Sequence, residues 1–208
     1  MNVLVVLAHP RRDSFTGTLL DHFVAGLEEG GHVAEIADLH AEGFNPCFQP
    51  EDQAQFEGGT LPDDVLAEQS RIERNDVIAL VFPFYWWSFP ALLKGWIDRV
   101  WSEGWAYHWT LERPYGLINK DLIVLGSCGS SERTFEGKRR YGAAISNNID
   151  MGTFSYCGIN KVTRHMFYEV DTNPEIRLQY LAKAHRAGLE IGVPADDVSS
   201  AAAEPCAP

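Results

Sequence analysis

Three short segments of the chain carry side chains that could bind or react with a ligand. The first, His9 to Thr16, combines a histidine with arginines and hydroxyl groups, which suits an anionic group. The second, Pro83 to Trp87, is mostly aromatic, which suits a flat, conjugated ring. The third, Ser127-Cys128-Gly129-Ser130-Ser131, contains a glycine that lets the backbone approach a ligand closely. Together they could hold a phosphate at one end and a planar ring at the other.

Each of these segments follows an apolar run that is predicted to be a β-strand. The three runs are Val3–Leu7, Val77–Phe82 and Leu122–Leu125. Proline neither donates to a sheet ladder nor extends a helix, so Pro83 marks the end of the second run. In open α/β sheets, ligands bind at the carboxyl ends of the strands, so the three segments are expected to meet there.

Strand patterns alternate with helical patterns along the whole chain. Two further strands are expected at His32–Ala37 and Lys161–Phe167. Helices are expected at Ser14–Glu29, Val65–Arg74, Ala91–Trp101, Tyr141–Tyr156 and Glu175–Ile191, and a long loop at Asp38–Leu61. This alternation predicts an α/β protein, a flavodoxin-like three-layer α/β/α fold with a five-stranded parallel sheet in the order 2-1-3-4-5. No GxGxxG follows the first strand, which argues against a nicotinamide-type Rossmann site.

Length, charge and cysteine spacing limit the classes of protein to which the chain can belong. The 208 residues suit one domain, expected over residues 1–192, with a tail at 193–208 whose composition predicts disorder. A net charge of −12 disfavours nucleic acid and anionic lipid, and no apolar run is long enough to span a membrane. The four cysteines lack CxxC or zinc spacing, so neither a metal site nor a disulfide framework is indicated. We therefore expect a soluble, cytoplasmic protein.

The start of the first helix is the candidate phosphate site. Hydroxyls of Ser14 and Thr16, free backbone N–H groups and the helix dipole would attract an anion there. A second interpretation of Ser14 stays open, namely a helix N-cap with no role in binding. His9 at a strand end beside this helix is poorly explained by packing, which favours the binding site.

Three motifs are long enough to compare with known families. They are Leu7-Ala8-His9-Pro10 with Ser14-Phe15, Phe82-Pro83-x-x-Trp86, and Pro90-Ala91-x-Leu93-Lys94-Gly95-Trp96-x-x-Arg99-Val100. Together they resemble the NAD(P)H:quinone oxidoreductase family of flavodoxin-fold flavoproteins, over about residues 2–190. The resemblance implies a homodimer with a non-covalently bound flavin at each interface. It also implies two-electron hydride transfer from NAD(P)H, through flavin N5, to a quinone or a similar aromatic acceptor.

The resemblance further implies which residues contact the flavin. The residues expected along its phosphates and ribityl chain are His9, Ser14, Phe15 and Thr16. The residues expected along its isoalloxazine ring are Pro83, Phe84, Tyr85, Trp86, Trp87, Cys128, Gly129 and Ser130. Family members that bind FAD use an arginine on the last helix and an acidic residue on the helix after the aromatic loop. Arg177 and Asp98 fall at these places, which favours FAD over FMN.

Two positions depart from the family's catalytic pattern. Phe135 stands where the mammalian members place a tyrosine, and Tyr141 stands at or near the position of their histidine. Since phenylalanine cannot donate a proton, Tyr141 is the candidate donor. The resemblance also implies an aromatic substrate pocket over the flavin, in which the last three residues come from the partner subunit: Trp86, Trp87, Tyr107, Trp109 and Tyr156.

The expected dimer buries the helix Ala91–Trp101 and the loop Ser102–Thr110. The reason is the aromatic surface of four tryptophans in or beside this span, Trp96, Trp101, Trp105 and Trp109. Two alternatives to a quinone reductase stay open. One is a regulatory flavoprotein subunit of a membrane transport system, and the other is a reductase of azo or nitro compounds or of a pathway intermediate.

Overall fold

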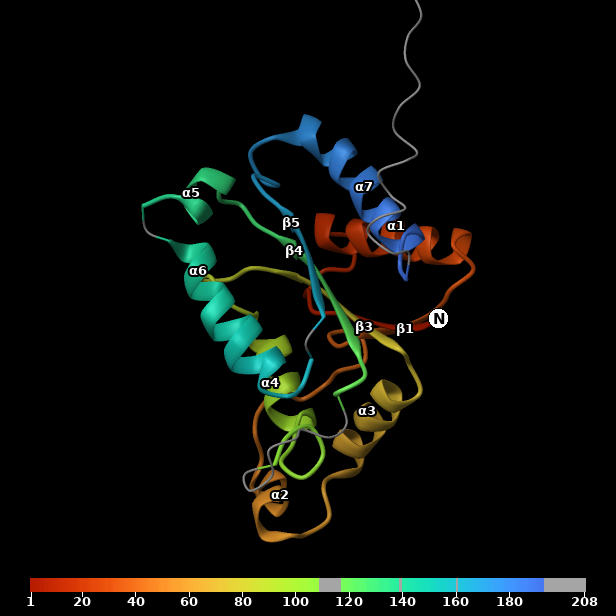
Figure 1. The fold of residues 1–208 in the computed structure, drawn as a ribbon, viewed down its shortest axis with the longest axis vertical. Helices are drawn as coiled ribbons and strands as arrows, with labels where there is room; N and C mark the ends of the chain where they lie inside the picture. The colour runs from red at the N-terminus through yellow and green to blue at the C-terminus, as the bar shows by residue number, and fades with distance from the viewer. Residues whose placement is uncertain (109–116, 139, 160, 193–208) are drawn as a thin grey trace, which may run out of the picture.

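The computed structural model describes residues 1–108, 117–138, 140–159 and 161–192. Its centre is a parallel sheet of five strands in the order β2-β1-β3-β4-β5 (Figure 1). The strands are β1 (Asn2–Leu7), β2 (Val33–Asp38), β3 (Val77–Pro83), β4 (Asp121–Ser127) and β5 (Val162–Phe167). The predicted flavodoxin-like fold and strand order are confirmed. The tail at 193–208, predicted to be disordered, lies outside the described residues.

Every residue of β3 is buried, because helices cover both faces of the sheet. Leu7 of β1 lies beside Val81 of β3, and Val81 lies beside Leu125 of β4. The carboxyl ends of these three strands are therefore level. As a result, the three candidate segments leave the sheet at the same edge.

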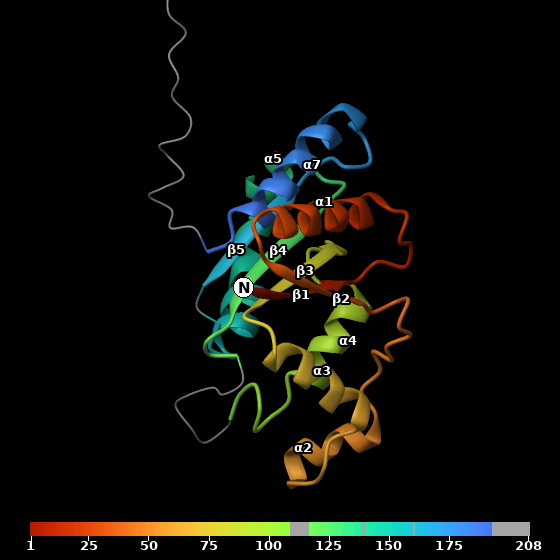
Figure 2. The ribbon, with the colours of Figure 1, turned by 90° about the vertical axis from the view of Figure 1, so that its right-hand side faces the viewer.

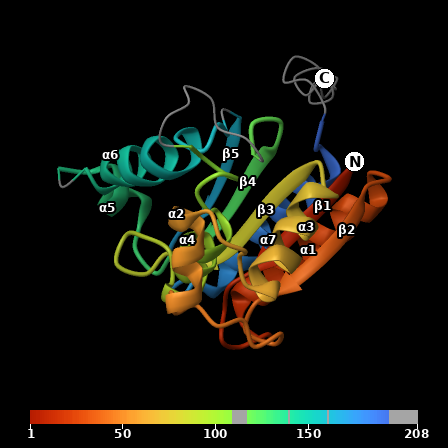
Figure 3. The same ribbon diagram turned by 90° about the horizontal axis from the view of Figure 1, so that it is seen from below.

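Two helical layers cover the sheet, as Figures 1 and 2 show from the side and Figure 3 from below. The helices α1 (Phe15–Glu29) and α7 (Pro174–Leu189) pack together on one face. The other face is covered by α3 (Asp63–Glu73), α4 (Ala91–Val100), α6 (Tyr141–Ile145) and η2 (Ser146–Ser155). Three short helices complete the described chain, namely η1 (Pro50–Gln53), α2 (Ala54–Glu57) and α5 (Glu132–Glu136).

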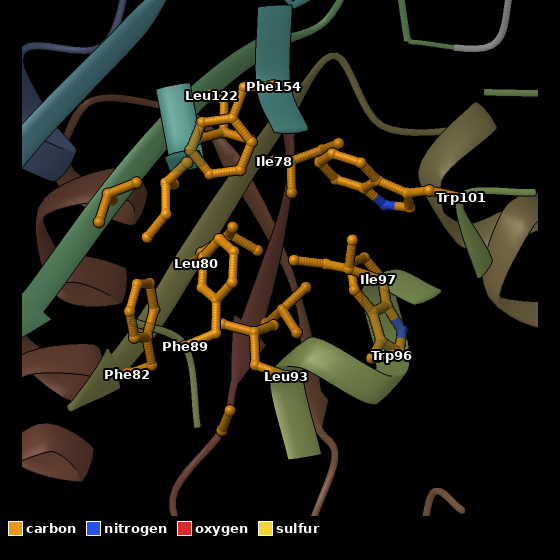
Figure 4. Close-up of a cluster of buried hydrophobic side chains, with 14 of the residues drawn as sticks. Ile78, Leu80, Phe82, Phe89, Leu93, Trp96, Ile97, Trp101, Leu122 and Phe154 are labelled. Carbon is orange, nitrogen blue, oxygen red and sulfur yellow. The ribbon is translucent and has the colours of Figure 1, made fainter. Parts of the chain in front are cut away.

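The core beneath α4 is rich in large rings. Figure 4 shows Trp96 and Trp101 packed with side chains from β3, β4 and η2. Trp96 is fully buried and Trp101 is 4% exposed within the single protomer. These two rings therefore give no reason for a second subunit to cover α4, contrary to the argument from the sequence.

Two segments differ in detail from the sequence prediction. The expected loop Asp38–Leu61 contains η1 and α2, and η1 is fixed to α4 by a buried arginine. Arg99 Nε lies 2.8 Å from Asp52 Oδ2, and Arg99 Nη1 lies 2.6 Å from Asp64 Oδ2. The expected helix Tyr141–Tyr156 is present, but only its first part is the α-helix α6, and from Ser146 to Ser155 it is the π-helix η2. No helix among the described residues is long and apolar enough to cross a membrane.

Candidate functional site

A large cleft of about 600 Å³ lies at the carboxyl edge of the sheet. Its lining comes from the last residues of β3 and β4, from the loops that follow β1, β3, β4 and β5, and from α1 and α7. The lining residues are His9, Arg11, Asp13, Ser14, Phe15, Thr16, Pro83, Phe84, Tyr85, Ser127, Cys128, Gly129, Val170, Asp171 and Arg177. A small pocket of about 220 Å³ adjoins it and shares Phe84, Cys128 and Gly129 with it. The other residues lining the small pocket are Trp86, Trp87 and Ser130.

The start of α1 forms one end of the large cleft. Ser14 is the N-cap, since its Oγ accepts a hydrogen bond of 3.1 Å from the backbone N–H of Gly17. The N–H groups of Phe15 and Thr16 have no acceptor within the helix, so they are available to an anion. The side chain of Thr16 is buried, with its Oγ1 2.8 Å from Ser127 Oγ of β4. This contact fixes the start of α1 against the end of β4.

Two basic side chains flank this helix start. The ring of His9 is turned into its own loop, with Nδ1 3.0 Å from the backbone N of Arg11. Arg177 reaches back from α7, and its Nε donates a 2.7 Å hydrogen bond to the carbonyl oxygen of Val170. Its guanidinium carbon lies 5.5 Å from the centre of the Phe15 ring. The charge of Arg177 is thus held at the rim of the cleft by a hydrogen bond and a cation–π contact.

The aromatic segment is a tight turn at the other end of the cleft. Tyr85 N donates to Ser88 O at 3.1 Å, and Ser88 N donates to Tyr85 O at 3.0 Å. Between them, Trp86 and Trp87 have φ angles of 49° and 62°, the left-handed conformation of a type I′ turn. Such turns favour Asn and Gly, so two tryptophans here store strain of about 1–3 kcal/mol each. The turn leaves Trp86 93% exposed.

Two aromatic rings, those of Tyr141 and Phe135, pack against Trp87. The ring of Tyr141 lies parallel to that of Trp87, with centres 3.8 Å apart and planes 7° apart. Phe135 is 2% exposed and packs its ring edge to face against Trp87 at 5.0 Å. On its other side Phe135 meets Tyr168 at 5.2 Å, and burial raises the pKa of Tyr168 to about 12. The structure therefore brings Phe135 and Tyr141 together against Trp87, which lines the small pocket, although neither of the two lines either cavity itself.

The loop after β4 brings backbone and a thiol to the junction of the two cavities. Ser130 N donates to Cys128 Sγ at 3.2 Å, and burial raises the pKa of the Cys128 thiol, so it stays protonated at neutral pH. A Cβ on Gly129 would lie 2.8 Å from Oδ2 of the exposed Asp171 side chain, which would have to move to admit it. A flat ring could lie against this backbone, opposite the aromatic turn.

Some predicted site residues lie away from both cavities. Asp98 is on the exposed side of α4, where it pairs with Lys94. Tyr107 and Tyr156 pack against each other with ring centres 5.5 Å apart, and neither lines the large cleft or the small pocket. Trp109 lies outside the described residues.

Five residues line the large cleft without having been predicted as site residues, namely Arg11, Asp13, Ser127, Val170 and Asp171. Arg11, Asp13 and Ser127 belong to loops that the sequence pattern had already singled out. Val170 and Asp171 follow β5, the fifth strand that the pattern predicted, and its carboxyl end was the available signal.

Comparison with known proteins identifies the family. The family described by its flavodoxin-like fold matches residues 1–190, and the chain belongs to it. An NAD(P)H:quinone oxidoreductase from Methanothermobacter marburgensis superposes with a TM-score of 0.82 at 35% identity, covering 91% of this chain and 98% of that one.

Two curated relatives agree with this structure. An uncharacterized NAD(P)H oxidoreductase from Haemophilus influenzae is 33% identical, over 82% of this chain and 85% of its own. NAD(P)H dehydrogenase (quinone) 1 from Rattus norvegicus is 30% identical, over 86% of this chain and 73% of its own. These matches confirm the resemblance to the NAD(P)H:quinone oxidoreductase family, and with it the predicted class of enzyme, a flavin-dependent NAD(P)H oxidoreductase.

Proposed function

We propose that the protein transfers two electrons from NAD(P)H to a quinone or a similar aromatic acceptor, using a flavin held in the large cleft. The observation that carries this proposal is the continuity of the site. One cleft runs from the anion-binding start of α1 to an aromatic turn, and a small pocket adjoins it there. When bound, a flavin supplies the redox chemistry, while the protein binds and orients it.

The donor set of the cleft fits a flavin at both ends. The N–H groups of Phe15 and Thr16, with His9, would bind the phosphate. Arg177 at the rim would reach a second phosphate, which favours FAD over FMN. The ring would lie between the aromatic turn and the backbone of residues 128–130, where N–H groups stabilise the negative charge of a reduced ring.

Tyr141 is the proposed proton donor to the acceptor. Its ring stacks on Trp87, which lines the small pocket, so the hydroxyl is held near the place proposed for the acceptor. Phe135 holds the other side of Trp87 and exchanges no proton. Tyr141 would therefore act directly on the acceptor, and Phe135 only through the position of Trp87.

A homodimer is part of the proposal. Four exposed apolar side chains support it, Tyr85, Trp86, Met151 and Tyr156, which are 47%, 93%, 62% and 58% exposed. A second subunit that covered them would enclose the aromatic turn. Tyr107 and Tyr156, which do not line their own cleft, could then reach the partner's site.

The first experiment identifies the cofactor and the reaction. The protein is purified, its absorption spectrum is recorded, and the released flavin is identified by chromatography. Oxidation of NADH and NADPH is then followed with a simple quinone and with an azo compound. We expect bound FAD and a higher kcat/KM for the quinone. A protein that binds no flavin when FAD or FMN is added, or that oxidises neither nucleotide, would refute the proposal, and preference for the azo compound would change the acceptor.

The second experiment tests Tyr141 by stopped-flow measurement of the two half-reactions. Tyr141→Phe should slow oxidation of the reduced protein by the quinone by about 10²–10⁴-fold, the contribution of a positioned general acid. Reduction by NAD(P)H should change much less. Phe135→Tyr is the matched control, and it should impair neither step. Equal rates for wild type and Tyr141→Phe would mean that water supplies the proton.

A further inference from the structure

A basic segment lies beside the small pocket in a strongly acidic protein. The chain carries a net charge of −12, yet residues 133–140 include Arg133, Lys138 and Arg140, and residue 139 is also an arginine. Glu136 is the one acidic residue of this stretch, and Glu132 directly precedes the stretch. A local excess of positive charge against the charge of the whole protein marks a place where an anion would gather.

The basic side chains of this segment are exposed in the structure. Glu136 turns back onto the start of α6, where its Oε1 lies 2.5 Å from the point that a Cβ on Gly142 would occupy. The side chains of Arg133, Lys138 and Arg140 are exposed. Among residues that the structure describes, none of these three forms an ion pair. Their charges are therefore available to a ligand.

Arg140 places the basic segment next to the candidate site. Arg140 directly precedes Tyr141, whose ring stacks on Trp87 in the wall of the small pocket. The groups that suit the flavin phosphates, Phe15 and Arg177, line the large cleft instead. A ligand whose ring entered the small pocket could thus extend toward Arg140 without meeting the flavin phosphates.

We propose that Lys138 and Arg140 bind the 2′-phosphate of the dinucleotide donor and thereby select NADPH over NADH. This inference rests on the proposed function, because it assigns the donor to the same site. A phosphate monoester carries a charge of about −1.5 to −2 at neutral pH, so it gains more than the other groups of the nucleotide from two nearby cations. An anionic acceptor would be attracted to the same two cations, and the test distinguishes binding of NADPH from binding of such an acceptor.

The test uses the flavin-loaded protein and the double variant Lys138→Gln/Arg140→Asn. Asparagine is chosen because Arg140 has a φ of 52°, a left-handed conformation that asparagine tolerates. The matched control is Arg186→Gln on the exposed side of α7, far along the chain from this segment. Titration calorimetry measures binding of NADP⁺ and NAD⁺, and steady-state assays measure kcat/KM for NADPH and NADH with a neutral quinone and with a quinone sulfonate.

We expect wild type to bind NADP⁺ more tightly than NAD⁺. The double variant should bind NADP⁺ about 2–30-fold more weakly, the effect of losing two exposed ion pairs, and NAD⁺ nearly as before. The NADP⁺ affinity of wild type should also fall more steeply with salt than that of the variant. The control should match wild type throughout.

Three outcomes would overturn the inference. Wild type could bind the two nucleotides equally, the variant could retain the NADP⁺ affinity, or the variant could weaken only the quinone sulfonate, which would assign the segment to the acceptor. In each case, continued oxidation of NADH by wild type would leave the proposed function intact. Loss of all nucleotide oxidation in wild type would instead refute the proposed function itself.

Discussion

The replacement Gly126→Ala tests how the sheet shapes the candidate site. Gly126 lies in β4, beside Phe82 of β3 and Met166 of β5. A Cβ at this position would stand 2.3 Å from Cε2 of Phe84. Carbon atoms pack at about 3.5–4.0 Å, so the Phe84 ring would have to move by roughly 1.2–1.7 Å, the difference between these distances. It is already confined by Phe82 and Phe135, whose ring centres are 4.9 and 6.1 Å away.

The open direction for the Phe84 ring is the site itself, because Phe84 lines both the large cleft and the small pocket. We expect Gly126→Ala to weaken flavin binding, because the displaced Phe84 ring would enter the space proposed for the flavin. The added methyl group should also cost about 1–3 kcal/mol of stability through overpacking. Flavin fluorescence titration measures the Kd of the first effect, and thermal unfolding of the apoprotein measures the second.

Two control variants locate the cause. Adding Phe84→Leu to Gly126→Ala shortens the side chain that the methyl group meets, and should restore most of the lost stability. Gly152→Ala adds a methyl group at an exposed position of η2, where the nearest atom is Asn147 O at 3.3 Å, and should change flavin binding little. If Gly126→Ala kept both the wild-type Kd for flavin and the wild-type Tm, the packing argument for Phe84 would be wrong.

Three further predictions concern the rest of the structure. His9→Ala should weaken flavin binding by about 1–3 kcal/mol and leave the kcat of the flavin-loaded protein nearly unchanged. An unchanged flavin content with a much lower kcat would show that His9 does not bind the phosphate. Arg99→Met leaves the fully buried carboxylate of Asp52 unpaired, so urea unfolding should show a loss of about 3–5 kcal/mol, and a loss below 1 kcal/mol would contradict this account. Glu35 has a pKa lowered from 4.5 to about 2 by its bond to Arg74, so it stabilises the fold above pH 4.5 and less as the pH falls toward 2. Glu35→Gln should remove this part of the acid sensitivity in circular dichroism, and identical acid curves would refute it.

The sequence predicted the sheet well because its strands have strong local signals. Runs such as Val3–Leu7 and Val77–Phe82 are apolar throughout, as strands covered on both faces must be, and each is separated from the next by a helical pattern. The short helices η1 and α2 could not be predicted in this way. The first of them depends on Arg99, which lies on α4 and meets Asp52 only after folding.

The candidate site was predictable where a loop has unusual composition. The aromatic turn and the loop around Gly129 carry such signals, whereas Val170 and Asp171 come from a loop without one. The left-handed conformation of Trp86 and Trp87 could not be predicted from the sequence either, because local propensity favours Asn and Gly in that conformation. Tertiary contacts with Tyr141 and Phe135 hold Trp87 there instead.

The exposure of Trp86 gives the protein an optical reporter of its own. Its indole is 93% exposed, so we expect it to emit at long wavelength as in water, and we expect the buried Trp96 and Trp101 to emit at shorter wavelength. A ligand or a subunit that covers the turn removes the long-wavelength part of the emission first. Unfolding of the core does the opposite, because it shifts the buried tryptophans toward long wavelength. The colour of the emission therefore distinguishes occupation of the site from loss of the fold in a single measurement.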